Sequence, residues 1–104
     1  MSRKETIKNL LFVCYGNICR SPMAEGQAKK MLGNKVKIES AGLAPYFESA
    51  AEKAVEVLKN FYGINISNHS PRSVTDLDLK RFGLIIALDS IVWSNLHTSV
   101  MSSL

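Results

Sequence analysis

A cysteine and an arginine six positions apart are the side chains of this sequence best suited to covalent chemistry. Cys14 opens the string CYGNICRSP, which contains Arg20. A thiolate is a strong nucleophile, and a guanidinium can hold two oxygens of a phosphate group in one planar fork, a geometry that lysine cannot copy. The pair therefore predicts a phosphate-binding loop that contains a nucleophile.

The flanking residues predict that this string lies between a strand and a helix. Residues 10–13 form a continuous apolar run typical of a buried strand, and Ser21 and Pro22 suit the N-cap and first position of a helix. Anions bind at helix N-termini because free N–H groups and the positive end of the helix dipole meet there, and the same field favours ionisation of a thiol. The alternative is structural: Cys14 as a small buried residue and Arg20 as a surface charge.

The rest of the chain alternates helix-like and strand-like patterns. Apolar spacing predicts helices at 23–32, 51–62 and 91–96, a short helix at 76–80, an edge strand at 36–39 and a strand covered on both faces from Leu84 to Leu88. The segment 97–104 reads as an uncapped, mostly polar tail. Alternating strands and helices predict an α/β fold with a parallel sheet, and residues 1–104 fit one domain because no repeat or linker divides them.

Composition narrows the possible partners. The net charge of +4 comes from scattered basic residues, so we expect no nucleic-acid partner, although a mildly positive field would attract acidic, phosphorylated substrates. No apolar run is long enough for a signal peptide or a membrane span, and two cysteines fit a reducing compartment. We therefore expect a cytoplasmic protein with no membrane partner, no cofactor and no metal.

The string CYGNICRSP resembles the phosphate-binding loop of the low-molecular-weight protein tyrosine phosphatases. Three later segments resemble the same family in the same order, namely residues 40–42, the pair 63–69 and 72–75, and 82–89. The resemblance implies a three-layer α/β sandwich around a parallel sheet with strand order 2-1-3-4. It also implies that phosphotyrosine on a protein, or a small aryl phosphate, is the substrate.

The resemblance assigns a role to each position of the loop. Cys14 would attack phosphorus to form a cysteinyl-phosphate that water then hydrolyses, and Ser21 would donate a hydrogen bond to the sulfur. Arg20 and the loop amides would hold the phosphate oxygens; these positions are Tyr15, Gly16, Asn17, Ile18, Cys19 and Arg20. Gly16 permits a tight turn and Asn17 tolerates left-handed backbone. Asn17 would brace the loop through a network that includes His69, whose alternative role is merely structural or solvated.

Cys19 has two possible roles. It either packs behind the loop, or it traps an oxidised Cys14 as a transient disulfide, which is the role that the resemblance favours. The family's thioredoxin-coupled arsenate reductases need further cysteines downstream, and none follows Cys19 in these 104 residues. This observation disfavours that branch.

Three aromatic residues could form a specificity rim above the phosphate. In the family, hydrophobic residues flank the substrate ring at positions that match Tyr15, Tyr46 and Phe47, whose alternative role is ordinary half-buried packing. Family members that act on phosphoarginine carry a threonine where this chain has Ile18. Ile18 therefore favours phosphotyrosine.

The sequence also departs from the family pattern. It contains no Asp-Pro pair, which in the family supplies the general acid, and Asp89 matches a structural position, so we assign no general acid. Nor does it show the fourth strand, which leaves the segment from Leu84 to Leu88 at a sheet edge able to pair with a second copy or another partner. We expect a phosphotyrosine phosphatase whose domain is incomplete at its C-terminus; the alternative is an impaired phosphotyrosine-binding module or a partial domain without function.

Overall fold

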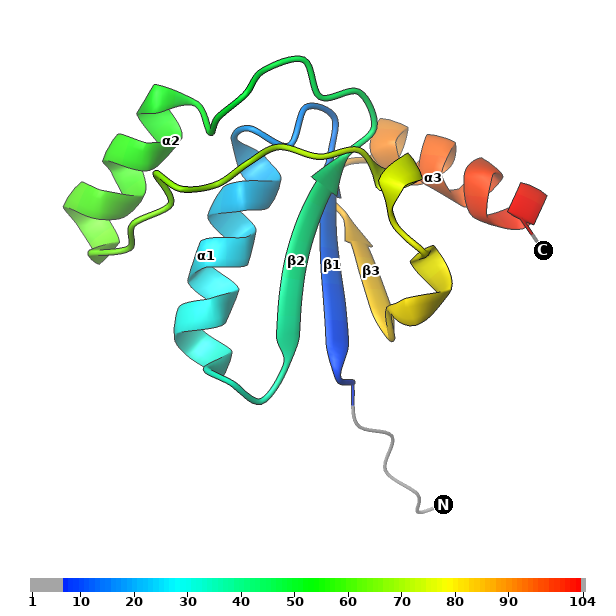
Figure 1. Ribbon diagram of the computed structural model, residues 1–104, viewed down its shortest axis with the longest axis horizontal. Coiled ribbons are helices and arrows are strands. Elements are labelled where there is room, and N and C mark those ends of the chain that lie inside the picture. The colour runs from blue at the N-terminus through cyan, green and yellow to red at the C-terminus, as the bar shows by residue number, and fades with distance from the viewer. Residues whose placement is uncertain (1–6, 104) are drawn as a thin grey trace.

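Three parallel strands form the centre of the protein, in the order β2-β1-β3 (Figure 1). The computed structural model describes residues 7–103, with side chains described for residues 7–96. The strands are β1 (Asn9–Cys14), β2 (Lys37–Gly42) and β3 (Leu84–Ala87). β1 pairs with both neighbours, and its Leu11 and Val13 are fully buried. The predicted α/β fold with a parallel sheet is confirmed.

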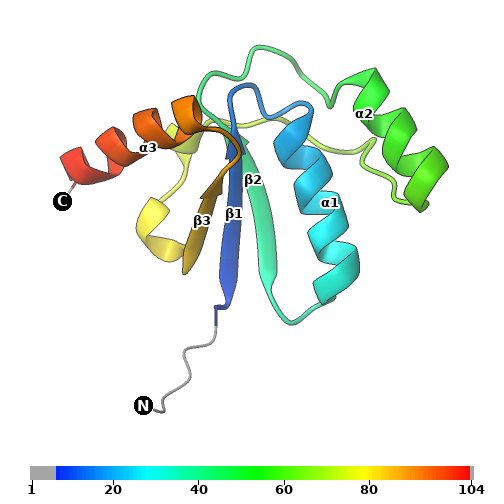
Figure 2. The same cartoon turned by 180° about the vertical axis from the view of Figure 1, so that it is seen from behind.

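Helices cover both faces of this sheet, as the two opposite views show (Figures 1 and 2). One face carries α1 (Arg20–Leu32) and α2 (Glu52–Val57), which continues as a π-helical turn, η1 (Leu58–Tyr62). The other carries α3 (Ser90–Ser103) and two short 3₁₀ turns, η2 (Val74–Asp76) and η3 (Leu79–Arg81). The result is a three-layer arrangement. No helix within residues 7–103 is both long and apolar enough to cross a membrane.

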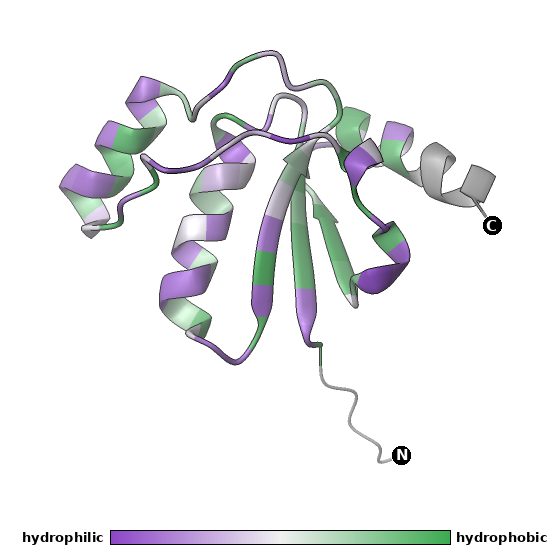
Figure 3. Cartoon of the chain, in the orientation of Figure 1, coloured by the Kyte–Doolittle hydropathy of each residue, from purple (hydrophilic) through white to green (hydrophobic). Residues whose placement is uncertain are grey.

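The two layers of helices enclose two separate hydrophobic cores. The larger core lies between the sheet and the α3 side, and its buried residues are Leu11, Val13, Ala41, Val74, Phe82, Val92 and Leu96. The smaller core joins α1 to α2 through Ala54, Leu58 and Ile66, with Met23 packed against them. Figure 3 shows that apolar residues are concentrated in the strands β1 and β3. The string CYGNICRSP connects β1 to α1.

The start of α1 differs from its prediction. The helix begins at Arg20, with Cys19 as its N-cap residue and no side-chain capping bond, so Ser21 and Pro22 lie inside the first turn and are buried. The predicted capping role of Ser21 is wrong because its hydroxyl is engaged with Cys14 and Asn17 instead. The predicted end of this helix before Gly33 is confirmed.

The second long helix is confirmed, but helical periodicity overstated how much of each helix is buried. Gly63, at φ 67°, ends the combined α2 and η1 in the left-handed conformation that glycine tolerates best. Met31, Phe61 and Tyr62 are exposed by 82%, 77% and 50% although they continue the apolar spacing. All three lie in the last turn of their helices, beyond the residues that the cores enclose.

Three later segments also correct the predictions. The expected helix at 76–80 is replaced by η2 and η3, with the extended Leu77 between them and the Asp78 side chain capping the second turn. The prediction that β3 is covered on both faces is wrong, since Leu84 is 41% exposed. The strand lies at the end of the sheet among the described residues, where fewer elements pack over it. The backbone of α3 continues through most of the predicted tail at 97–104, whose side chains lie outside the described residues.

A charged cluster closes the free edge of β2. Glu39 is almost completely buried, yet its carboxylate accepts hydrogen bonds from Arg72 Nη2 at 2.7 Å and from Arg81 Nη1 at 2.8 Å. Arg72 Nε also donates to the Ser40 carbonyl at 3.1 Å, so its side chain occupies an edge position that another strand could otherwise use. The Arg81 guanidinium, and after it Arg72, lowers the pKa of Glu39 although burial acts in the opposite direction.

Replacing Glu39 with glutamine should destabilise the protein at neutral pH. Because Arg72 and Arg81 are 40% and 36% exposed, solvent screening limits the expected loss to about 1–2 kcal/mol. The folded pKa of Glu39 lies below its unfolded value of about 4.3, so the carboxylate's contribution is present above that value and is lost as the pH falls through the folded pKa.

Urea unfolding of both proteins, followed by circular dichroism from pH 7 to pH 3.5, measures this contribution. The difference in unfolding free energy between parent and Glu39→Gln should narrow toward acid. A difference that stays constant over the whole range would contradict the assigned ionic contacts.

Candidate active site

Residues 15–19 form the loop between the carboxyl end of β1 and the first residue of α1, as the sequence predicts. Cys14 ends β1 and is 97% buried, while Arg20 opens the helix and is half exposed. The first-turn N–H groups of α1 have no partner within the helix, and they lie at the end of the helix that adjoins the loop. The structure thus places a thiol and a guanidinium beside an anion-binding helix terminus.

Two hydrogen-bond donors face the sulfur of Cys14. The backbone N–H of Asn17 donates to Sγ at 3.2 Å, and the Ser21 hydroxyl lies 3.0 Å from Sγ. Because Asn17 Nδ2 donates to Ser21 Oγ at 2.8 Å, the hydroxyl hydrogen of Ser21 is free to point at the sulfur. Both contacts hold the sulfur in place at the base of the loop.

A pocket of about 260 Å³ opens above the sulfur. Its lining combines the predicted loop and the predicted rim: Cys14, Tyr15, Gly16, Ile18, Cys19, Arg20, Ala44, Tyr46 and Phe47. Tyr46 and Phe47 are 77% and 65% exposed, so ordinary half-buried packing does not describe them. Tyr15 and Tyr46 both line the pocket, and a hydrogen bond with Tyr46 raises the pKa of Tyr15.

Asn17 is the most constrained residue of the loop. It is completely buried and has φ 56°, the one positive φ among the described non-glycine residues. Besides its contact with Ser21, its Nδ2 donates to Ser40 Oγ at 3.0 Å and its Oδ1 accepts from the Arg72 backbone N–H at 3.0 Å. Its carbonyl meets His69 Nε2 at 2.8 Å. Left-handed backbone costs about 1–2 kcal/mol, and this set of contacts holds it in place.

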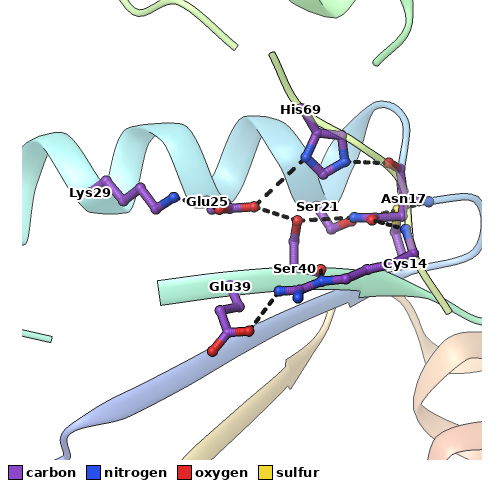
Figure 4. Close-up of polar contacts among 9 residues, drawn as sticks. Cys14, Asn17, Ser21, Glu25, Lys29, Glu39, Ser40 and His69 are labelled. Atoms are coloured by element: carbon purple, nitrogen blue, oxygen red, sulfur yellow. Dashed lines mark hydrogen bonds and ion pairs between the residues drawn. The ribbon is translucent and has the colours of Figure 1, made fainter. Parts of the chain in front are cut away.

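The network continues from Asn17 into α1 and β2 (Figure 4). Ser40 Oγ donates to Glu25 Oε1 at 2.5 Å, and Lys29 Nζ lies 2.7 Å from the other oxygen of that carboxylate. His69 Nδ1 lies 4.0 Å from Glu25, so the ring stands between this carboxylate and the loop. The structure thus brings His69 to the loop instead of leaving it in solvent.

Sequence reasoning missed Glu25, Ser40 and Arg72 as members of the site. Glu25 lies four residues after Ser21 on α1, and this helical spacing could have placed it on the face that meets the loop. Ser40 and Arg72 come from separate parts of the chain. Their approach to Asn17 depends on the packing of β2 and of the segment after η1, which no local pattern reveals.

Arg20 pairs with Asp89 across the loop. Its Nη1 lies 2.8 Å from Asp89 Oδ2, while Asp89 Oδ1 accepts the Val92 backbone N–H at 2.7 Å. The Val92 N–H, followed by Arg20, lowers the pKa of Asp89. A carboxylate that stays ionised cannot donate a proton at neutral pH, so Asp89 is not placed to act as a general acid. Among the described residues that line the pocket there is no Asp or Glu, and Asp89 lies outside this lining.

Cys19 is exposed, and both cysteines are free thiols. The predicted alternative in which Cys19 packs behind the loop is therefore wrong. Among the described residues, no group of three or more His, Cys, Asp or Glu side chains could hold a metal ion.

The end of β2 braces the back of the loop. The Leu43 and Ala44 N–H groups donate to the carbonyls of Cys14 and Tyr15 at 3.2 and 2.9 Å. At Gly42 a Cβ would lie only 2.7 Å from the Tyr15 carbonyl and 2.9 Å from the Asn17 nitrogen. Only a glycine lets the strand approach the loop this closely.

Replacing Gly42 with alanine should therefore displace the loop and slow the alkylation of Cys14 by iodoacetamide about tenfold or more at neutral pH. Gly83→Ala is the matched control, since a Cβ there would meet its neighbours at ordinary distances of 3.5 Å and above. The rate is measured by mass spectrometry of the alkylated peptide. An unchanged rate in Gly42→Ala would show that the loop does not depend on this contact.

Fold and site together define an α/β protein with a cysteine at the end of its first strand, followed by a loop that leads into a helix N-terminus. The model of the low molecular weight phosphotyrosine protein phosphatase family matches residues 9–102, and the chain belongs to that family. The resemblance stated from the sequence is confirmed.

Proteins named arsenate reductase and proteins named tyrosine phosphatase are both among the relatives of this chain. An arsenate reductase of Staphylococcus aureus (strain Newman) is 39% identical over 85 residues, which cover 82% of this chain and 63% of the relative. The low molecular weight protein tyrosine phosphatase of T. tengcongensis is 46% identical, with a TM-score of 0.68 over 78% of this chain and 58% of that one. YfkJ from Bacillus subtilis is 38% identical, with a TM-score of 0.77 over 93% and 64%. The chain thus matches less than two thirds of each relative's length.

Proposed function

We propose that this protein hydrolyses aryl phosphomonoesters, with phosphotyrosine as the natural chemical class, through a cysteinyl-phosphate on Cys14. The observation that carries this proposal is the pair of donors, Asn17 N–H and Ser21 Oγ, facing a thiol at the base of an open pocket. Membership of a phosphotyrosine phosphatase family supports it. The loop backbone and Arg20 would hold the phosphate oxygens.

The reaction would take place in two displacements. In the first, the Cys14 thiolate attacks phosphorus, the S–P bond forms and the P–O bond to the phenol breaks. In the second, water attacks the same phosphorus, the S–P bond breaks and inorganic phosphate leaves. Ser21 would lower the barrier of the second step, because its hydroxyl can donate to the thiolate as that thiolate is expelled.

Two features of the pocket favour an aromatic substrate. Tyr15, Tyr46 and Phe47 would flank a phenyl ring at the pocket mouth. Ile18, also in the lining, adds an apolar contact on the loop itself. A protein that bears phosphotyrosine, or a small aryl phosphate, is thus the proposed partner. The two free thiols suit a reducing compartment, and a cytoplasmic location is part of the proposal.

Because no Asp or Glu is among the described residues that line the pocket, turnover by residues 1–104 should depend strongly on the leaving group. We expect p-nitrophenyl phosphate, whose phenolate leaves unaided, to be hydrolysed about 10²-fold or more faster than phosphotyrosine. A pre-steady-state assay of reduced protein should show a burst of p-nitrophenolate that Cys14→Ser abolishes.

Equal activity in parent and Cys14→Ser would contradict the mechanism. If the folded parent bound phosphate but released no p-nitrophenolate above the variant, a catalytically impaired phosphate-binding module would be the better description. If the folded parent neither bound phosphate nor hydrolysed p-nitrophenyl phosphate, the chain would be a partial domain without a function of its own.

Arsenate reduction is a second candidate, because the chain is 39% identical to proteins named arsenate reductase. The Cys14 thiolate would attack arsenate with loss of water. The exposed Cys19 would then attack the sulfur, releasing arsenite and leaving a Cys14–Cys19 disulfide for a dithiol reductant to reduce. Arsenite formation with a thioredoxin system, lost in Cys19→Ser while p-nitrophenyl phosphate hydrolysis persists, would favour this activity.

We further propose that residues 1–104 form a single domain that self-associates through β3. The outer edge of this strand pairs with no other strand among the described residues, and Leu84 on it is 41% exposed. Apolar, unpaired edges are templates for another strand.

Light scattering after size-exclusion chromatography should therefore show a mass that rises with protein concentration. Leu84→Lys should shift the protein toward monomer, because a charged edge residue opposes strand pairing. Met31→Lys is the control at an exposed apolar position on α1, away from the sheet edge. A monomeric parent at high concentration would count against self-association.

A further inference from the structure

We propose that Arg72, anchored by Glu39, is a positioning residue for the phosphate-binding loop and sets the reactivity of Cys14 from the far side of β2. The inference rests on the proposed function of that loop. It concerns residues that belong neither to the pocket lining nor to the string 14–22.

Arg72 connects the loop to both faces of the sheet. Its backbone N–H donates to Asn17 Oδ1 at 3.0 Å, and its carbonyl accepts the Gly42 N–H at 2.8 Å. Its side chain crosses the free edge of β2, where Nε donates to the Ser40 carbonyl and Nη2 to Glu39. Ser40 and Glu39 are adjacent in the strand and point to opposite faces. Arg72 therefore clamps the strand while its backbone meets the loop.

The Asn17 amide needs this clamp for its orientation. Arg72 N–H is the partner of Oδ1, and with the oxygen fixed, Nδ2 must face Ser21 and Ser40. If the Arg72 backbone moved, the amide could rotate and Ser21 would lose the donor that orients its hydroxyl toward Cys14. Polar networks of this kind lose more than one contact when a single member shifts.

The backbone of Asn17 also contacts the sulfur of Cys14 directly. Its N–H donates to Cys14 Sγ, and this geometry exists only while Asn17 keeps φ 56°. Left-handed backbone at a non-glycine residue persists only where its surroundings hold it. Releasing one of the contacts that hold Asn17 should therefore displace the N–H that faces the sulfur and change the shape of the loop.

Arg81 provides an internal comparison for Arg72. Both guanidiniums bind the Glu39 carboxylate at nearly the same distance, and their side chains are similarly exposed. Arg81 instead stacks over the Phe82 ring, 4.4 Å from its centroid, on η3 and away from the loop. Loss of either arginine removes an ionic partner of Glu39, but only loss of Arg72 frees the backbone that meets Asn17.

The experiment compares Arg72→Met with Arg81→Met in a Cys19→Ser background, so that iodoacetamide reports on Cys14 alone. Alkylation rates are measured by mass spectrometry across pH 5 to 9, with and without inorganic phosphate as a protecting anion. We expect Arg72→Met to slow the alkylation of Cys14 about tenfold and to weaken phosphate protection about tenfold. Arg81→Met should stay within about twofold of the parent in both measurements.

Urea unfolding of the same variants separates positioning from stability. The two substitutions should lower the unfolding midpoint by similar amounts, so a purely structural role for Arg72 would predict equal changes in alkylation. Equal changes, or none in Arg72→Met, would overturn the proposal. If circular dichroism shows that Arg72→Met does not fold, Arg72→Lys takes its place, since lysine can reach Glu39 or the Ser40 carbonyl but cannot hold both.

Alkylation does not depend on hydrolysis, so the two proposals fail in different ways. A parent that is alkylated and protected by phosphate, yet hydrolyses no p-nitrophenyl phosphate, would overturn the phosphatase proposal and leave the role of Arg72 intact. A parent that hydrolyses the ester with Arg72→Met unchanged in alkylation would overturn only the role of Arg72.

Discussion

The left-handed backbone of Asn17 is the constraint on which the site depends. At this one residue the chain turns from the end of β1 into α1, and the turn aims a backbone N–H at the sulfur of Cys14. The conformation is unfavourable by itself, so its cost must be offset by contacts from elsewhere. Those contacts come from α1, β2 and the segment after η1, which means that the loop takes its shape only when the whole domain has folded.

This dependence explains why polar residues are buried in so small a protein. Ser21, Ser40 and Asn17 are all nearly inaccessible, and within the described residues every buried polar side-chain atom has a hydrogen-bond partner. A buried polar group without a partner would cost about 1–3 kcal/mol. The satisfied network instead makes the loop rigid, so that its backbone is fixed by contacts within the protein.

Two separate groups of ion pairs lie near the loop. Arg20 at the pocket is paired with Asp89, and Glu39 behind the sheet is shared by Arg72 and Arg81. Each carboxylate has a lowered pKa and stays ionised at neutral pH. These two carboxylates therefore hold the arginines in position at the loop and at the edge of β2.

The sequence by itself determined the family and fold class of this protein and the order of its elements. The spacing of Cys14 and Arg20, the apolar run before them and the alternation of patterns were enough to predict a parallel α/β sheet with a phosphate loop after its first strand. These features are local, because a helix or a strand needs only its own periodicity to be visible.

Tertiary structure decided what holds the loop. Arg72 meets Asn17 across 55 positions and Ser40 meets it across 23, and neither pairing leaves a mark in the sequence. It also decided that Ser21 serves the sulfur and does not cap α1, and that Leu84 is left exposed on β3. The physical reason is that burial and hydrogen bonding at these residues depend on packing between elements, which local propensity does not contain.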